Sequence, residues 1–228
     1  MARDSTETRA ALLEAGRHLF ATEGIFSTPL SSVIKIAGQR NSSALQYHFA
    51  DGYPDARLGL LYAIIATNNA SAEIVRQKML DDVIRENRMK DLPSLVGVAV
   101  LPLAHKFKDP AGREFLSIIS QMVDEFNNWD AGSPDMPSAA LVTFRLIEQA
   151  LSDELSPAIR HERVVRYLQM TSEAIGSHAR YVTSVQNGPI DQRRLSTPAF
   201  FSNLIDMAVG ALRAPAVSEL SERDLDLL

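Results

Sequence analysis

The most restrictive feature of this 228-residue sequence is a pair of short helical segments joined by a tight turn, at residues 28–49. The first segment, residues 31–37, has apolar residues at helical spacing, and Thr28 or Ser31 can act as its N-cap. Gly38 follows, where a left-handed backbone conformation is common. The second segment begins at a cap on Asn41 or Ser42 and ends at Phe49. This pattern predicts a helix-turn-helix.

The second segment has one apolar side and one polar side. Ala44, Leu45 and Phe49 are expected to face a core, which leaves an outward row at Ser43, Gln46, Tyr47 and His48. A short helix with small, hydrogen-bonding side chains on its outer face fits the major groove of DNA. A solvated helix face is the simpler alternative for Ser and Gln side chains taken alone.

A preceding helix at residues 6–22 completes a three-helix unit, with its apolar stripe at Leu12, Ala15, Leu19 and Phe20. Residues 8–49 resemble the DNA-binding domain of the TetR family of transcriptional regulators. The matching features are a first helix ending in Leu-Phe before a Gly, an Ile-Ala helix, an Ala-Gly turn, and a last helix closing in Tyr-His-Phe. The resemblance implies a DNA-binding domain at residues 1–50 and a ligand-binding and dimerisation bundle at residues 51–228.

Two features depart from the family pattern. The Ala-Gly turn continues as Gln39-Arg40-Asn41 in place of a Val-Ser type pair, and no Lys follows Phe49 at the start of the next helix. Arg57 takes the place of that Lys if residues 52–56 are a short insertion. Gln46 is expected to read a base, and Tyr47 and His48 are expected to touch the sugar-phosphate backbone. The complete set of expected DNA contacts is Thr28, Ser31, Arg40, Asn41, Ser42, Ser43, Gln46, Tyr47, His48 and Arg57.

Composition indicates a cytoplasmic protein. The sequence has no cysteine, and its polar N-terminus does not resemble a signal peptide. No apolar run approaches the roughly 18 residues that are needed to span a membrane, so we expect no membrane partner. The formal net charge is −5, but the first 50 residues carry one more basic than acidic group, so DNA attraction must come from local placement.

The rest of the chain also reads as helical, and no segment shows the alternation of a strand. Residues 1–7 are expected to form a disordered arm. A bend is expected at Pro102, which lacks an amide hydrogen. Further helices are predicted at residues 56–88, 91–107, 113–128, 138–151, 156–186 and 197–214. The prediction is an all-α fold of about nine helices, in which the 56–88 helix links the two domains.

No catalytic motif is present. The sequence has no G-x-S-x-G, phosphate-binding loop or H-E-x-x-H pattern, and its five histidines are scattered, so we expect no enzyme activity, metal or cofactor. Apolar side chains that suit an unknown small-molecule effector lie at Phe107, Phe115, Met122, Phe126, Trp129 and Phe144. Plain core packing is the alternative for each of them.

The last two helices are the expected dimer interface, as the family resemblance implies, with Leu168, Ile175, Val182, Phe201, Ile205 and Val209. Intramolecular packing is the alternative here. The sequence therefore supports a ligand-responsive regulator, most simply a repressor, that binds a pseudo-palindromic DNA operator as a homodimer. The other hypothesis is an α-helical small-molecule-binding protein or enzyme without DNA binding.

Overall fold

The computed structural model describes residues 2–41, 43–124, 138–151, 153, 155–185 and 193–216. Those residues form nine α-helices and one 3-10 helix, and none of them forms a strand, so the predicted all-α fold is confirmed. The helices are α1 Ala2–Glu23, α2 Leu30–Ile36, α3 Ala44–Phe49, α4 Ala56–Arg85, α5 Leu92–Val100, η1 Leu101–Lys108, α6 Pro110–Ile119, α7 Ser138–Gln149, α8 Pro157–Val185 and α9 Thr197–Arg213.

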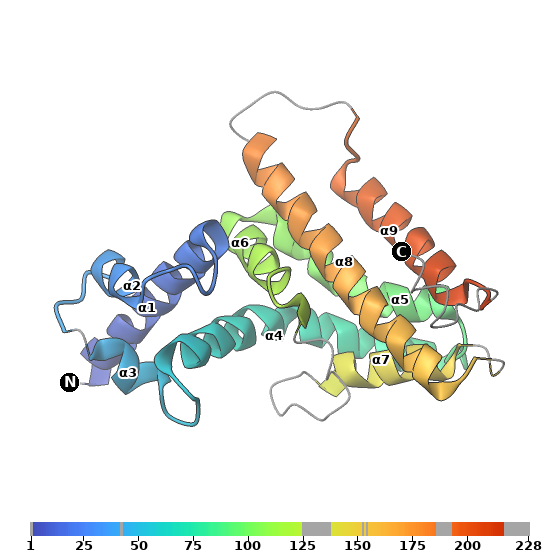
Figure 1. Cartoon of the computed structure of the whole chain (residues 1–228), viewed down its shortest axis with the longest axis horizontal. Helices are drawn as coiled ribbons and strands as arrows, with labels where there is room; N and C mark the ends of the chain where they lie inside the picture. Colours follow the sequence, from blue (N-terminus) through green and yellow to red (C-terminus); the bar gives the residue numbers. More distant parts are fainter. Residues whose placement is uncertain are drawn as a thin grey trace, which may run out of the picture.

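Helices α1, α2 and α3 form one end of the molecule and enclose a hydrophobic cluster that we call the N-terminal core (Figure 1). The apolar stripe predicted for α1 lies inside it, with Leu12 and Phe20 fully buried. The cluster also takes residues from beyond the three helices: Leu60 and Ile64 come from α4, and Ile118 comes from α6. Helices α4 and α6 therefore complete the core on which the helix-turn-helix packs.

Helix α4 connects this end to the rest of the chain (Figure 1). Asp55 is its N-cap and accepts a hydrogen bond from the Leu58 amide at 2.9 Å, so α4 begins at the predicted residue 56. Near its other end, Leu80 and Val83 belong to a second cluster, the C-terminal core. One helix thus contributes to both cores.

By length and composition α4 could cross a membrane, since an 18-residue window reaches a mean hydropathy of 1.3. The sequence-based expectation that no stretch is this apolar was therefore wrong. The signal is weak evidence for a membrane span, because α4 supplies buried residues to both cores.

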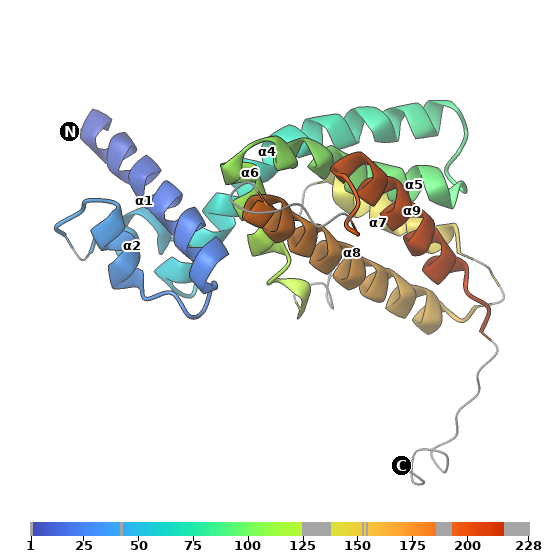
Figure 2. The same ribbon diagram turned by 90° about the horizontal axis from the view of Figure 1, so that it is seen from above.

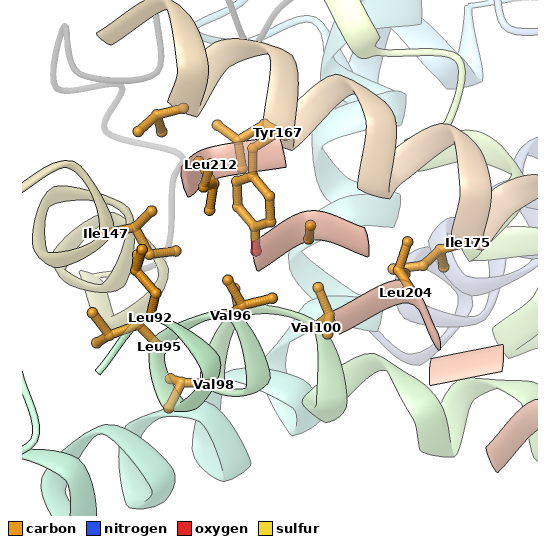
Figure 3. Close-up of a cluster of buried hydrophobic side chains, with 14 of the residues drawn as sticks. Leu92, Leu95, Val96, Val98, Val100, Ile147, Tyr167, Ile175, Leu204 and Leu212 are labelled. Carbon is orange, nitrogen blue, oxygen red and sulfur yellow. The ribbon is translucent and has the colours of Figure 1, made fainter. Parts of the chain in front are cut away.

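The C-terminal core lies between α4, α5, α6, α7, α8 and α9. Helices α8 and α9 lie side by side in both views, and α5 packs on α9 while α7 packs on α8 (Figures 1 and 2). Figure 3 shows part of this core, where Val96 on α5, Tyr167 on α8 and Leu204 on α9 point toward a common interior.

Several helix ends differ from the sequence-based prediction. Helix α1 begins at Ala2 instead of following a disordered arm, since neither Gly nor Pro interrupts residues 2–15. At Pro102 the chain continues as a 3-10 helix, because proline cannot continue the α-helical hydrogen bonds. Asp109 caps α6 by accepting a hydrogen bond from the Gly112 amide at 2.7 Å, so α6 begins at Pro110 and not at the predicted residue 113.

Helix α6 ends at Ile119, earlier than the predicted residue 128, and residues 125–137 lie outside the described part of the chain.

Candidate nucleic-acid interface

Helix α3 presents a polar face on a rigid apolar base. Ala44, Leu45 and Phe49 are at most 7% exposed and pack into the N-terminal core. Gln46 is exposed on the opposite side, and Tyr47 is 79% exposed. An exposed aromatic ring beside an exposed amide offers both stacking surface and hydrogen bonds to a partner. This is the division between buried and outward residues that the sequence predicted.

The turn between α2 and α3 also places polar side chains on the surface. Gly38 has φ 67°, the left-handed conformation expected after α2. Asn41 accepts a hydrogen bond from the Ser43 amide at 2.9 Å, which fixes the chain just before α3. Arg40, Asn41 and Ser43 are exposed, as is Ser31 on α2, whereas His48 is half-buried. Ser42, another predicted contact, lies outside the described residues.

Thr28 cannot take the role predicted from the sequence, because it is 0% exposed. Its hydroxyl donates hydrogen bonds to the carbonyl oxygens of Gly24 at 2.7 Å and Leu19 at 3.2 Å. It neither caps α2 nor reaches the surface, since the N-cap position is Pro29 without a side-chain hydrogen bond. Thr28 instead holds the α1–α2 connection against α1.

Arg57 also has an internal function in place of the predicted phosphate contact. Its Nη1 donates to the carbonyl oxygens of Ile25 at 2.5 Å and Thr28 at 2.7 Å. The side chain is half-buried at the start of α4. Arg57 therefore ties α4 to the connection that precedes the helix-turn-helix, and we assign it to positioning that connection.

Helices α3 and α4 approach each other most closely at Gly59. A Cβ atom built on Gly59 would lie 1.5 Å from the carbonyl oxygen of Phe49, so only glycine fits there. A cavity of about 410 Å³ opens beside this contact, and its walls include Arg9, His48, Asp51, Tyr53 and Tyr62. The Tyr53 and Tyr62 rings stack with centroids 5.3 Å apart, which joins the 50–55 connection to α4.

Helix α6 makes a contact with α1 that the sequence did not indicate. Gln121, just after α6, accepts a hydrogen bond from the Ile25 amide at 2.9 Å and donates one to the Phe20 carbonyl at 2.9 Å. Glu114 lies 3.3 Å from Arg17 Nη1 and 2.8 Å from His18 Nδ1. The end of α6 is therefore attached to the helix that supports the polar face of α3. Only a tertiary contact identifies these residues, since their spacing in the sequence carries no motif.

The predicted effector residues do not line one cavity. Phe107 is 6% exposed and Phe115 is 1% exposed, so both fill the C-terminal core, and Phe144 packs against that core from α7. Met122 packs against the N-terminal core instead, because α6 turns toward α1. The prediction that Met122 belongs to the effector site is therefore wrong. Phe126 and Trp129 lie outside the described residues.

Half of the predicted dimer residues are buried within the chain itself. Leu168, Ile175 and Phe201 are at most 4% exposed because α8 and α9 pack on each other and on the core. These three cannot form a surface between two copies, so the prediction is wrong for them. Val182, Ile205 and Val209 are half-buried at the edge of the core and remain candidates. On α9, Met207 is 56% exposed beside them.

His178 joins α8 to α9 through an aromatic cluster. Its ring stacks on Phe200 with centroids 4.1 Å apart, and its Nε2 lies 3.3 Å from the Thr197 hydroxyl. Burial lowers the pKa of His178, and the positive charge of Arg194 lowers it further. The neutral ring is therefore the form that the fold favours.

Acidification should weaken the fold through His178. Stability from the neutral ring is complete above the unfolded pKa of about 6.5 and is lost as the pH falls from there through the lower folded pKa. The melting temperature should drop more between about pH 7.5 and about pH 5.5 in the wild type than in His178→Phe, which keeps a ring against Phe200. Equal drops in the two proteins would show that another group controls the acid sensitivity.

The chain was compared with known families, curated proteins and solved structures. No family model matches the sequence, and no curated protein matches it. A solved structure from Rhodococcus sp., provisionally described as a TetR-family transcriptional regulator, is 19% identical, with coverage of 91% of this chain and 99% of that chain and a TM-score of 0.47. At that identity and TM-score, function has to follow from the residues of this chain.

Proposed function

We propose that this protein is a ligand-responsive transcriptional regulator that binds a pseudo-palindromic DNA operator as a homodimer and represses transcription. The single observation that carries the proposal is the outward pair Gln46 and Tyr47 on a helix whose opposite side is buried. A helix of this kind can enter the major groove, where an amide can pair with a base edge and a phenol can reach the backbone. Arg40, Asn41 and Ser43 flank it on the same exposed segment.

Dimerisation would use the outer edges of α8 and α9. A helix-turn-helix reads two half-sites about 34 Å apart when two copies are related by a two-fold axis. The half-buried Val182, Ile205 and Val209 could be covered by a second copy, with Met207 as an exposed apolar neighbour. An effector that prefers one spacing of the two reading helices would shift the equilibrium away from DNA in proportion to its differential affinity.

Two routes could carry the signal between the C-terminal core and the reading helix. Helix α4 contributes to both cores, as the sequence-based hypothesis required. The α6–α1 contact through Gln121 and Glu114 gives a second route. A regulator of this kind would act in the cytoplasm.

The test is a fluorescence-polarisation titration with the DNA upstream of the protein's own gene, or with duplexes selected from a random pool. The double variant Gln46→Ala, Tyr47→Ala should bind about 10- to 100-fold more weakly, since a base contact contributes about 1–3 kcal/mol. Its melting temperature should stay close to that of the wild type because both side chains are exposed.

Gln149→Ala, at an exposed position on α7, is the matched control and should leave affinity unchanged. Unchanged affinity in the double variant would mean that α3 does not read DNA.

The second candidate is a small-molecule-binding protein without DNA binding. It is favoured by the net charge of −5 and by the internal use of Arg57, the residue expected to neutralise a phosphate. The two candidates differ in one measurement: a regulator shows salt-dependent binding to at least one duplex from the random pool, and the alternative shows none.

A further inference from the structure

Two hydrogen-bond donors beside the C-terminal core are buried without a partner among the described residues: Arg76 Nε and the Tyr167 hydroxyl. Arg76 is 4% exposed on α4, and Tyr167 is 2% exposed on α8. Buried polar groups in folded proteins nearly always have a partner, and an unsatisfied one is destabilising. A third such atom, Arg17 Nη1, differs because it lies 3.3 Å from the Glu114 carboxylate.

The charge of Arg76 is already balanced. Its Nη1 lies 2.5 Å from Glu73 Oε2, and its Nη2 donates to the Ala99 carbonyl on α5 at 3.4 Å. The other oxygen of Glu73 accepts from the Ala139 amide in the first turn of α7 at 2.7 Å. The ion pair therefore joins α4, α5 and α7, and only the Nε hydrogen is left over.

Tyr167 supplies the second donor from the opposite side of the core. Figure 3 shows its hydroxyl pointing from α8 toward α5, near Val96. Burial raises the pKa of this phenol far above its ordinary range, and the charge of Arg76 opposes that shift only in part. The hydroxyl thus keeps its proton. Arg76 approaches the same stretch of α5, since its Nη2 bonds to the carbonyl of Ala99, three residues after Val96.

The nature of these groups defines a complementary molecule. Two donors require an acceptor oxygen, because a ligand donor would leave the Arg76 Nε hydrogen unpaired. A carboxylate would add a second negative charge beside Glu73 with one buried cation between them, which is unfavourable in an apolar interior. A carbonyl oxygen has two lone pairs and no charge. The neighbouring side chains of Val96 and Val100 suit an apolar body.

We infer that the effector is an uncharged, largely apolar molecule with a carbonyl oxygen, held in the C-terminal core between α4, α5 and α8 by hydrogen bonds from Arg76 Nε and the Tyr167 hydroxyl. This inference rests on the proposed function, since it gives the chemical class of the effector of that regulator. Arg76 and Glu73 belong to α4, so the ligand acts on the helix that also supplies Leu60 and Ile64 to the N-terminal core.

Isosteric probe pairs test this with the full chain. Acetophenone and cyclohexyl methyl ketone carry a carbonyl, and benzoate and cyclohexanecarboxylate replace their methyl ketone with a charged carboxylate of similar size. At concentrations well above the dissociation constant, a bound probe raises the melting temperature. At least one ketone should raise it in thermal denaturation, and its carboxylate partner and ethylbenzene, which lacks an acceptor, should raise it less.

Two variants connect the response to the named atoms. Tyr167→Phe removes the hydroxyl, and Arg76→Lys removes Nε but keeps a positive charge beside Glu73; both should lose the ketone response. Without probe, Tyr167→Phe should melt at the same temperature as the wild type or higher, because its hydroxyl has no partner to lose. Tyr181→Phe, the same change at a less buried position on α8, is the control and should keep the response.

Four outcomes would overturn the inference: neither ketone stabilises the protein, a carboxylate stabilises it as strongly, Tyr167→Phe keeps the ketone response, or Tyr167→Phe alone lowers the melting temperature. The last would mean that the hydroxyl serves the fold through a bound water. None of these measurements involves DNA. A ketone response without duplex binding therefore refutes the proposed regulator alone, and duplex binding without a ketone response refutes the effector class alone.

Discussion

Gly59→Ala is expected to destabilise the protein by about 3 kcal/mol or more and to abolish DNA binding. The added Cβ would lie 1.5 Å from the Phe49 carbonyl oxygen and 2.7 Å from its carbon, and both are backbone atoms at the end of α3. A flexible side chain could move aside, but here α3 and α4 must separate. Separation would expose Leu45 and Phe49, which hold α3 in the N-terminal core.

Gly210→Ala is the matched control. Gly210 lies in α9, and a Cβ there meets nothing within 4 Å. Because alanine is the better helix former, the free energy of unfolding of this variant should rise by about 0.5–1 kcal/mol. Urea denaturation followed by circular dichroism measures both changes, and fluorescence polarisation measures DNA affinity. If the two variants unfold at the same urea concentration, the close approach of α3 and α4 is not rigid.

Arg113→Met should lower the free energy of unfolding by about 3 kcal/mol, which is the second-largest expected effect. Arg113 is 2% exposed on α6, where its Nη1 donates to the Phe107 carbonyl at 2.9 Å and its Nε to the Thr183 hydroxyl at 3.0 Å. Methionine fills similar space but donates nothing, so a buried carbonyl oxygen is left without its hydrogen bond. Each such orphan costs about 1–3 kcal/mol.

Arg145→Met supplies the comparison, since Arg145 is exposed on α7. Arg145→Met should change the free energy of unfolding by at most about 0.5 kcal/mol. Thermal and urea denaturation at neutral pH report both variants. A loss in Arg113→Met no larger than in Arg145→Met would mean that water replaces the guanidinium, and that α6, η1 and α8 are not joined through this side chain.

The parts of the fold that follow from local rules could be predicted from the sequence. Gly38 has the left-handed conformation that ends α2, and Asp55 caps α4. The spacing of apolar residues in α3 assigned Leu45 to the core and Gln46 to the surface, because helical periodicity fixes which side chains share a face.

The sequence-based predictions were wrong where a side chain contacts a residue that is distant in the sequence. Thr28 and Arg57 are polar residues near a helix start, a setting that suits a DNA contact equally well, and only the folded chain shows that they bond to backbone carbonyls. Met122 was assigned to the effector site with its apolar neighbours, but it packs against the N-terminal core. Periodicity identifies the buried face of a helix and does not identify the element that covers it.

The sharing of the N-terminal core with later helices has a consequence for how the molecule comes apart. A fragment that stopped at residue 50 would lack Leu60, Ile64 and Ile118, and the apolar surfaces that they cover would meet water. The helix-turn-helix therefore cannot be treated as an independent module. Heat or denaturant should unfold both cores in one cooperative step. A substitution that destabilises the C-terminal core should therefore also destabilise α3.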